Sequence, residues 1–339
     1  MTTVLVTGGA GFIGSHYVKE LLRADDVARV TVLDALTYAG HVENLGEAFL
    51  DPRLTFVEGS ILDAALVDQL MDGHTHVVHF AAESHVDRSL VGEPLFVETN
   101  VLGTQILVNA ALRHQVERFV HVSTDEVYGP LLEGMATEDA PLLPTVPYAA
   151  SKAASDLIAL SAHRTYGLPV CVTRSSNNYG PNQHPEKLIP RFITRLLRGE
   201  PVTLHGRGEH VRNWLHVKDN CQGISAVMRH GRPGEIYNIA GGTDLTTVQL
   251  TDLLLKVCGA DQDLVTFVPD RRANDRRYAM DWSKIRAECG YRPQRDLLEE
   301  LAVTADWYRS HPDRWAPLSD GAVVIPQLAT TAALAGVAR

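Results

Sequence analysis

The chain has 339 residues, of which 45% are hydrophobic and 21% are charged, and its formal net charge is −10. A chain of this length and composition can bury a sizeable core, and we expect two closely joined domains. The acidic balance argues against nucleic acid or an anionic membrane as a partner, because no basic run overrides it.

The chain begins with a strand, a glycine turn and a helix. An apolar strand at residues 4–7 leads into Gly-Gly-Ala-Gly-Phe-Ile-Gly at 8–14, and a helical pattern follows at 15–23. Glycines at this spacing let the backbone approach a pyrophosphate, and the free N–H groups of the helix start attract its phosphates. The next strand, 30–33, ends at Asp34, twenty residues past Gly14, where a carboxylate can bind the adenosine ribose. Asp34 would repel a 2′-phosphate, so we predict NAD rather than NADP.

Further strands are predicted at 54–57, 76–80, 118–122 and 170–173, with helical stretches such as 104–113 between them. Alternating strands and helices predict an α/β fold with a Rossmann-like, doubly wound, mostly parallel sheet. The fourth of the chain's predicted strands is followed by Ala81, Ala82, Glu83, Ser84 and His85. Its small residues would let the backbone lie against the nicotinamide half of the cofactor, whereas His85 could equally be a histidine of a surface loop.

A hydroxyl and two adjacent carboxylates follow the strand at 118–122. Thr124, Asp125 and Glu126 therefore lie where a parallel strand ends, which is where α/β sheets place ligands. In a desolvated cleft such a pair can divide into a protonated acid and a charged base, which suits an elimination. The alternative is that the two acids only cap the following loop or helix.

Tyr148 and Lys152 form the second chemical pair. On a helix these positions share one face, so a phenol and an ammonium would lie together. A nearby positive charge lowers a phenol's pKa from about 10 toward neutrality, and Tyr148 could then remove a proton from an alcohol. In isolation this spacing is more often a solvated helix pair.

The second half of the chain changes in composition. A turn-rich passage at 177–190 precedes a helix predicted at 191–198, and arginines are scattered around 206–214 and 270–278. Arginine's planar fork suits diphosphate oxygens, so we expect a nucleotide-diphosphate site. We expect an NAD-binding domain at 1–176, a smaller mixed α/β nucleotide-sugar domain at 177–316, partly interleaved with the first, and a tail at 317–339.

Two features predict a cytoplasmic protein. The four cysteines are widely spaced without a C-x-x-C pair, which is typical of reduced thiols. The first residues form no basic leader, and the apolar stretch 322–337 is interrupted by Pro326 and other breaks, which falls short of a membrane span. We expect neither a membrane segment nor a metal site.

These motifs resemble the extended short-chain dehydrogenase/reductase superfamily and, within it, the dTDP-glucose 4,6-dehydratases. The similarity covers about residues 3–315, through T-G-G-A-G-F-I-G, S-T-D-E-V-Y-G, Y-A-A-S-K, N-N-Y-G-P, E-K-L-I-P and D-R-R-Y-A-M-D. The resemblance implies oxidation of the sugar at C4, elimination of water across C5 and C6, and return of the hydride to C6. In that reaction Thr124 would hydrogen-bond the 4-hydroxyl, Asp125 would be the acid, Glu126 the base, and Tyr148 with Lys152 would drive the oxidation.

The resemblance also implies the binding residues and a homodimer that packs helices including the one with Tyr148. Besides Tyr148 and Lys152, the residues expected to bind NAD are Gly8, Gly11, Phe12, Ile13, Gly14, Asp34, Leu36, Thr37, Ser60, Ile61, Ala81, Ala82 and Ser84. Those expected to bind the nucleotide sugar are Ser84, His85, Thr124, Asn178, Lys187, Leu188, His205, Arg212, Thr247, Arg271 and Asn274.

Several positions depart from the family pattern and leave alternatives open. His205 stands where tyrosine is usual, Asn274 where histidine is usual, Asn213 and Ser60 where aspartate is usual, and Thr247 near a usual asparagine. The substrate is therefore expected to be a nucleotide-diphosphate hexose, dTDP-glucose first, with another nucleotide possible. Two alternative functions remain open: a 4-epimerase or decarboxylase on the same scaffold, and a non-catalytic NAD-binding protein.

Overall fold

The computed structural model describes residues 1–91, 94–270 and 275–319. Two of the expected substrate residues, Arg271 and Asn274, lie outside the described residues, as does most of the expected tail.

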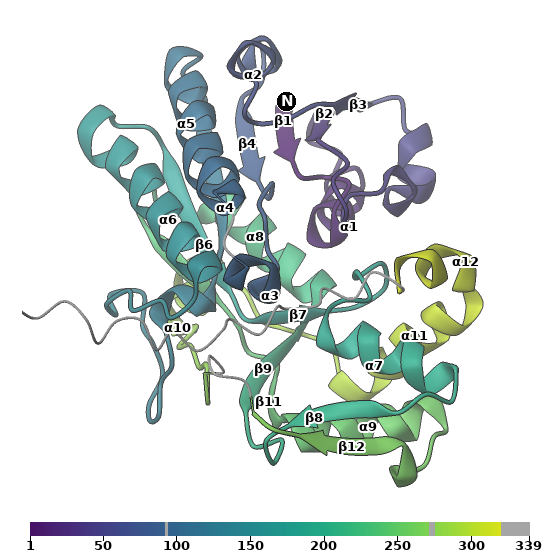
Figure 1. The fold of residues 1–339 in the computed structure, drawn as a ribbon. Coiled ribbons are helices and arrows are strands. Elements are labelled where there is room, and N and C mark those ends of the chain that lie inside the picture. Colours follow the sequence, from purple (N-terminus) through teal and green to yellow (C-terminus); the bar gives the residue numbers. More distant parts are fainter. Residues whose placement is uncertain (92–93, 271–274, 320–339) are drawn as a thin grey trace, which may run out of the picture.

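A seven-stranded sheet forms the larger part of the molecule (Figure 1). Its order is β10-β6-β5-β4-β1-β2-β3, and every neighbouring pair is parallel. In chain order the strands are β1 (Thr2–Thr7), β2 (Val27–Asp34), β3 (Leu54–Glu58), β4 (His76–His79), β5 (Arg118–Thr124), β6 (Val170–Ser175) and β10 (Ile236–Ile239). The chain runs outward from β1 in both directions, so the prediction of a doubly wound parallel sheet is confirmed.

Helices cover both faces of this sheet, and each face has its own apolar core. On one face α1 (Phe12–Leu21), α8 (Val217–His230) and α10 (Ser283–Cys289) pack on the strands. On the other face lie α2 (Ala64–Met71), α5 (Gly103–Arg113) and α6 (Pro147–Tyr166). Alternate residues of β1 point to opposite cores, Val4 and Val6 to the first and Leu5 to the second, as a strand buried on both faces requires.

Local sequence sets the limits of several helices. Helix α6 begins with Pro147, whose missing N–H costs nothing there, and ends at Gly167, which has a left-handed φ of 75°. Helix α9 (Thr247–Cys258) begins with a capping box in which Thr246 and Gln249 bond reciprocally, and it ends at Gly259 with a φ of 70°.

A smaller unit carries two short sheets. The first contains β7 (Asn177–Tyr179), β9 (Val211–His216) and β11 (Thr243–Thr246), and the second pairs β8 (Val202–His205) with β12 (Val265–Val268). Helices α7 (Leu188–Leu197), α9 and α11 (Leu297–Ser310) pack on them around a third apolar core, and α12 (Pro312–Trp315) follows. The remaining short helices are α3 (Val86–Leu90), α4 (Leu95–Val97), η1 (Val42–Asn44), η2 (Gly46–Leu50), η3 (Glu98–Leu102), η4 (Asp125–Tyr128), η5 (Gln262–Leu264) and η6 (Ala316–Leu318).

The structure differs from the sequence prediction in three places. Residues 177–179, expected in a turn-rich passage, form strand β7, which pairs with β9. Helix α7 begins at Leu188 rather than at 191. Its N-cap is Lys187, which has an extended backbone conformation, and Pro190 is accommodated in the first turn, where a missing N–H is tolerated. Helix α1 begins at Phe12, directly after the N-cap Gly11, rather than at 15. After β9 the chain runs through α8 and β10, which belong to the large sheet and its cover, and no difference from the predicted interleaving is involved.

One helical segment is apolar along its length. Residues 95–113, which include α4, η3 and α5, are long and apolar enough to cross a membrane by length and composition alone, with 44% of the most apolar window buried. The segment packs against α2 and α6 beside the large sheet. Core helices of soluble proteins commonly share this composition, so it carries no membrane assignment here.

Candidate active site

The residues expected to bind NAD follow four neighbouring strands. Gly8 to Gly14 follow β1, Leu36 and Thr37 follow Asp34 at the end of β2, Ser60 and Ile61 follow β3, and Ala81, Ala82 and Ser84 follow β4. These strands lie side by side in the order β4-β1-β2-β3, so the carboxyl ends bring these residues to a common edge.

The glycine turn leaves no room for side chains. Gly8 has a φ of 72°, and a Cβ there would lie 2.6 Å from the backbone nitrogen of Ala81. A Cβ at Gly14 would lie 2.2 Å from the carbonyl oxygen of Gly8. No side chain caps the start of α1 at Gly11, so its first N–H groups are available to a phosphate. The turn therefore fits the pyrophosphate of a dinucleotide.

Asp34 is held at the end of β2 by backbone hydrogen bonds. Its Oδ2 accepts from the N–H of Ala10 at 2.9 Å, and its Oδ1 accepts from the N–H of Leu36 at 2.9 Å. Burial raises the pKa of the Asp34 carboxyl, and these N–H donors oppose that rise. The carboxylate is thus fixed beside the glycine turn, as a ribose-binding acid must be.

The acidic pair lies at the end of β5. Thr124 ends the strand, and its Oγ1 accepts from the N–H of Glu126 at 3.3 Å and donates to Oδ1 of Asp125 at 3.2 Å. Asp125 is only 3% exposed. Burial, followed by the charge of Glu126, raises the pKa of Asp125 to about 7. Burial also raises the pKa of Glu126, which Lys187 and Arg212 oppose.

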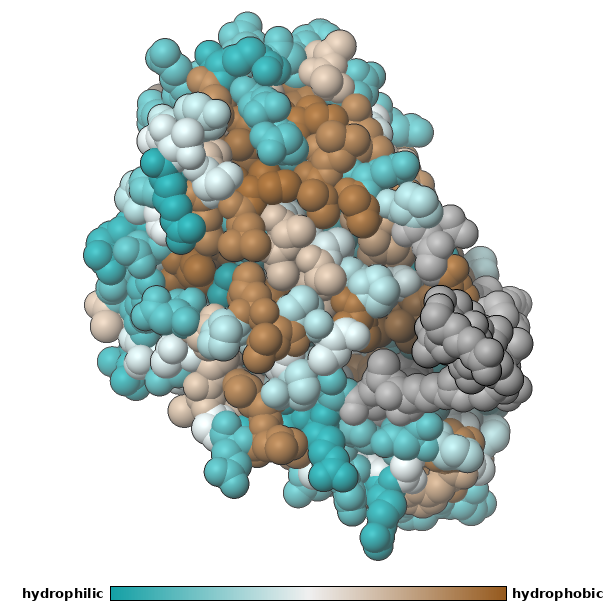
Figure 2. Space-filling model, turned by 60° about the vertical axis from the view of Figure 1, so that its left-hand side comes forward, coloured by the Kyte–Doolittle hydropathy of each residue, from teal (hydrophilic) through white to brown (hydrophobic). Residues whose placement is uncertain are grey.

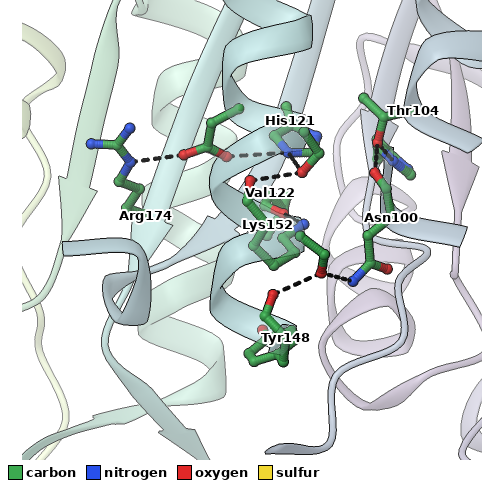
Figure 3. A network of polar contacts seen from close by, with 11 residues as sticks. Asn100, Thr104, His121, Val122, Tyr148, Lys152 and Arg174 are labelled. Carbon is green, nitrogen blue, oxygen red and sulfur yellow. Dashed lines mark hydrogen bonds and ion pairs between the residues drawn. The ribbon is translucent and has the colours of Figure 1, made fainter. Parts of the chain in front are cut away.

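Tyr148 faces this pair from α6. The pKa of its phenol is raised by burial first and then by the charges of Glu126 and Asp125, whereas the Thr124 side chain opposes the rise. This differs from the expectation that Lys152 would lower it. The Lys152 ammonium instead donates to the carbonyl oxygen of Val122 at 2.8 Å, in the interior between α6 and β5 (Figure 3). Burial lowers the pKa of Lys152 to about 8.

A buried polar layer that sequence reasoning missed supports this helix (Figure 3). Asp156, one turn after Lys152, accepts a hydrogen bond from Nε of Arg174 at 2.9 Å and lies 3.3 Å from Nε2 of His121. Nearer the start of α6, the Asn100 amide donates to Oγ of Ser151 at 2.8 Å. The apolar strands around these residues gave no signal for the layer, although a charged residue inside an apolar strand, such as Arg174, is itself unusual.

Basic residues of the smaller unit reach the same acids. The Lys187 ammonium donates to the backbone oxygen of Ser84 at 2.8 Å, and burial lowers its pKa. The Arg212 guanidinium lies 4.5 Å from the ring centroid of Tyr278. Tyr278 was not among the predicted site residues, although it stands in the quoted D-R-R-Y-A-M-D motif. The charges of Lys187 and Arg212 both lower the pKa of Glu126, so the two cations and the acids share one site.

The other predicted substrate residues occupy different places. Oδ1 of Asn178 is buried without a partner among the described residues, so it could accept from a ligand. His85 precedes α3 and lies 3.5 Å from Glu186, and Leu188 is the first residue of α7. His205 ends β8, with Nδ1 3.3 Å from the carbonyl oxygen of Pro269, and Thr247 begins α9 and bonds the His210 carbonyl oxygen at 3.2 Å. Within the described residues, no group of three or more His, Cys, Asp or Glu could hold a metal ion.

The comparisons agree with this geometry. The family model for GDP-mannose 4,6 dehydratase matches residues 5–303. A dTDP-glucose 4,6-dehydratase of Actinoplanes sp. is 53% identical over 317 residues, which cover 92% of this chain and 99% of that protein. Another, from Streptomyces antibioticus, is 57% identical over 320 residues, or 93% of this chain and 95% of that protein.

Solved structures of related enzymes have the same fold over most of this chain. The dTDP-glucose 4,6-dehydratase of Streptomyces venezuelae, solved with NAD and the ligand TYD bound, has a TM-score of 0.92 and 54% identity, covering 94% of this chain and all (100%) of that one. A UDP-glucose 4-epimerase of Thermotoga maritima, with UDP-glucose, has a TM-score of 0.85 at 31% identity, covering 92% and 100%. The scaffold alone therefore does not separate dehydratase from epimerase, and the site residues must do so.

Proposed function

This chain belongs to the dTDP-glucose 4,6-dehydratase family, and we propose that it converts dTDP-glucose to dTDP-4-keto-6-deoxyglucose with NAD as its cofactor. The observation that carries the proposal is the acidic pair beside Tyr148, in which Asp125 is buried and Glu126 is half-buried. An epimerase or a decarboxylase on this scaffold has no elimination to catalyse, so it does not need two acids of this kind. A binding protein would gain nothing from burying them.

The glycine turn and Asp34 would hold NAD, and the turn can be this tight because Gly8 and Gly14 have no Cβ to collide with the neighbouring backbone. When bound, NAD accepts a hydride from C4 of the sugar and returns it to C6. Thr124 is close enough to Tyr148 to lower the pKa of its phenol, and it is therefore placed to bind the 4-hydroxyl beside it. The 4-hydroxyl proton passes to the phenolate form of Tyr148. Because burial raises the pKa of this phenol, the phenol must first release its own proton to solvent, and the positive charge of the nicotinamide in bound NAD would favour that release.

The elimination uses the acids in different roles. A 4-keto group acidifies the C5 proton, and Glu126, which Lys187 and Arg212 help to keep ionised, removes that proton. Asp125 has a pKa of about 7 and so carries a proton in much of the population near neutral pH. It gives this proton to the departing 6-hydroxyl, and the C5 proton is replaced when the hydride returns.

The test is turnover with dTDP-glucose and the product's isotope content. Asp125→Asn and Glu126→Gln should each lower turnover by ~10²–10⁴, because each removes a positioned acid or base. Both variants should still bind NAD, whose predicted residues they leave intact. In D₂O the product should carry deuterium at C5. Near-normal turnover of both variants, or a C5 position that retains its hydrogen, contradicts the mechanism.

The nucleotide can be tested separately, because His205, Asn213 and Thr247 differ from the usual family residues. Asn213 Nδ2 donates to Oδ1 of Asp244 at 2.7 Å, whereas its Oδ1 is buried without a partner among the described residues and could accept a hydrogen bond from a ligand. Incubation with dTDP-, UDP-, CDP- and GDP-glucose, followed by mass spectrometry, should show loss of one water molecule from dTDP-glucose fastest. A product isomeric with its substrate would instead identify an epimerase.

The assembly proposed is a homodimer formed through α5 and α6. Figure 2 shows hydrophobic side chains gathered in a band on this side of the molecule. Exposed apolar residues from these elements and the segment before them include Val97, Leu102 and Leu157, which are 59%, 51% and 54% exposed. Large exposed apolar patches commonly mark protein interfaces. Leu157→Asp should give a monomer in light scattering, whereas Val303→Asp, at a site 53% exposed on α11, should not.

The proposed location is the cytoplasm. Cys171, Cys221, Cys258 and Cys289 all carry free thiols. Burial raises the pKa of each thiol, so they are poor nucleophiles and metal ligands. Unpaired buried thiols are typical of a reducing compartment.

A further inference from the structure

A second pocket lies outside the active site. It has a volume of about 440 Å³ and opens between α1, α8 and α11. Its lining includes Lys19 of α1, Arg23 just after that helix, Lys218 at the start of α8 and Arg295 just before α11. This volume is within the range of small-molecule sites.

The positive charge in this pocket is poorly neutralised. Lys19, Arg23 and Lys218 form no ion pair with any residue in the described ranges. Arg295 lies 3.8 Å from Asp219 and 3.8 Å from Glu300, at the outer limit of an ion pair. The pocket therefore concentrates cations in a chain whose net charge is −10.

The acidic and aromatic residues of the lining have defined positions. Glu20 is the acid in the lining, and its Oε1 accepts from Oγ of Ser225 at 2.9 Å. Burial raises the pKa of Glu20, and the hydrogen bond from Ser225 and the charges of Arg23, Arg229 and Arg295 oppose that rise, so Glu20 partly offsets the cations of the pocket. The Trp307 ring also lines the pocket, and its stacked partner His311 lies 5.0 Å away between ring centroids.

The cations also act on one another. Burial lowers the pKa of Lys19, and the charges of Arg314, Arg23 and Lys218 lower it further. The same Lys19, Lys218 and Arg23 charges help to lower the pKa of His16. A multivalent anion between these side chains would relieve that repulsion.

We propose that this pocket binds a compact phosphorylated anion, with a di- or triphosphate group held by Lys19, Arg23, Lys218 and Arg295. Guanidinium and ammonium groups together bind phosphate oxygens well. The indole of Trp307 is half-buried and lines the pocket, where it offers a surface for a base, so a nucleoside polyphosphate fits better than an inorganic anion. The site is separate from the acids of η4, although α1 carries both this pocket and the glycine turn.

The test uses the full chain saturated with NAD and dTDP, so that the active site is occupied. Inorganic pyrophosphate is then titrated by isothermal calorimetry. The expected result is saturable binding of one pyrophosphate per chain. Lys218→Glu should weaken this binding at least tenfold, or about 1.4 kcal/mol. An acid in the first turn of α8 suits the helix dipole, so the fold is not at risk.

The matched control is Lys256→Glu, which makes the same charge change at an exposed residue of α9. It should leave pyrophosphate affinity unchanged. A second titration, with GTP, distinguishes a nucleotide from an inorganic anion. If GTP binds more tightly than pyrophosphate and Trp307→Leu abolishes that difference, the ligand is a nucleotide. If GTP and pyrophosphate bind equally tightly, the ligand is the inorganic anion. Absence of saturable binding in the unmodified chain, or equal weakening by the two lysine substitutions, overturns the proposal.

Discussion

The Lys152 ammonium donates a hydrogen bond to the carbonyl oxygen of Val122 at 2.8 Å, where Lys152 is only 4% exposed. A buried ammonium needs a compensating charge, and Asp156 is the group that raises the pKa of Lys152 against the effect of burial. Asp156 is also paired with Arg174 at 2.9 Å. A single carboxylate thus offsets two buried cations beneath the proposed active site (Figure 3).

Asp156→Asn should therefore destabilise the protein by about 3–5 kcal/mol, because it leaves Arg174 buried without its counter-charge. Urea unfolding followed by circular dichroism measures this change. The control is Asp306→Asn, which breaks an exposed pair with Arg309 and should cost less than ~1 kcal/mol. Equal losses in the two variants would mean that the buried pair contributes no more than a surface pair.

The glycine turn makes a second prediction, with a control inside the chain. Gly8→Ala combines a strained φ of 72° with a Cβ 2.6 Å from the backbone of Ala81, whereas Gly167→Ala has a φ of 75° and nothing within 4 Å. Gly167→Ala should cost only the backbone strain, ~1–2 kcal/mol. Gly8→Ala should cost more and should also weaken NAD binding. Urea unfolding and fluorescence titration with NAD measure the two effects, and equal behaviour of the variants would rule out the steric role of Gly8.

How far the sequence predicted the molecule depended on how local each signal was. The glycine turn and Asp34 are set by residues close in the chain, and the parallel sheet follows from alternating apolar strands and helices. The hydrogen bond from Lys152 to the carbonyl oxygen of Val122 could not be predicted, because helical spacing indicates which side chains share a face but not which strand carbonyl lies against them. The layer of His121, Asp156 and Arg174 joins three elements and has no local pattern. Strand β7 is too short for periodicity to reveal.

Arg212 provides a third prediction, about substrate affinity. Its guanidinium lies 4.5 Å from the Tyr278 ring centroid and its charge acts on both Asp125 and Glu126. Arg212→Lys keeps the charge but loses the planar fork and much of the stacking, so KM for dTDP-glucose should rise roughly tenfold with a smaller change in kcat. Arg207→Lys, at a side chain 87% exposed, is the control and should change neither constant. Initial-rate kinetics on both variants measure KM and kcat, and an unchanged KM in Arg212→Lys would contradict the prediction.

The raised pKa of Asp125 gives a fourth prediction, because a buried catalytic acid should lower stability at high pH. The folded-state pKa is about 7, and an unfolded aspartate has a pKa of about 3.9. Above pH 7 the carboxylate is charged in both states, and the folded state bears the full cost of burying that charge. As the pH falls from 7 toward 4, the folded state takes up a proton first and the cost disappears.

Asp125→Asn removes this ionisation while keeping the shape of the side chain. It should therefore be more stable than the unmodified chain at pH 8, by on the order of 2–4 kcal/mol, and the difference should shrink toward zero near pH 4. Urea unfolding at a series of pH values measures the difference. Asp139→Asn, at an exposed acid, should show no such trend. If the Asp125→Asn variant were more stable by the same amount at every pH, the substitution would act through packing, and the ionisation of Asp125 would not lower the stability of the protein.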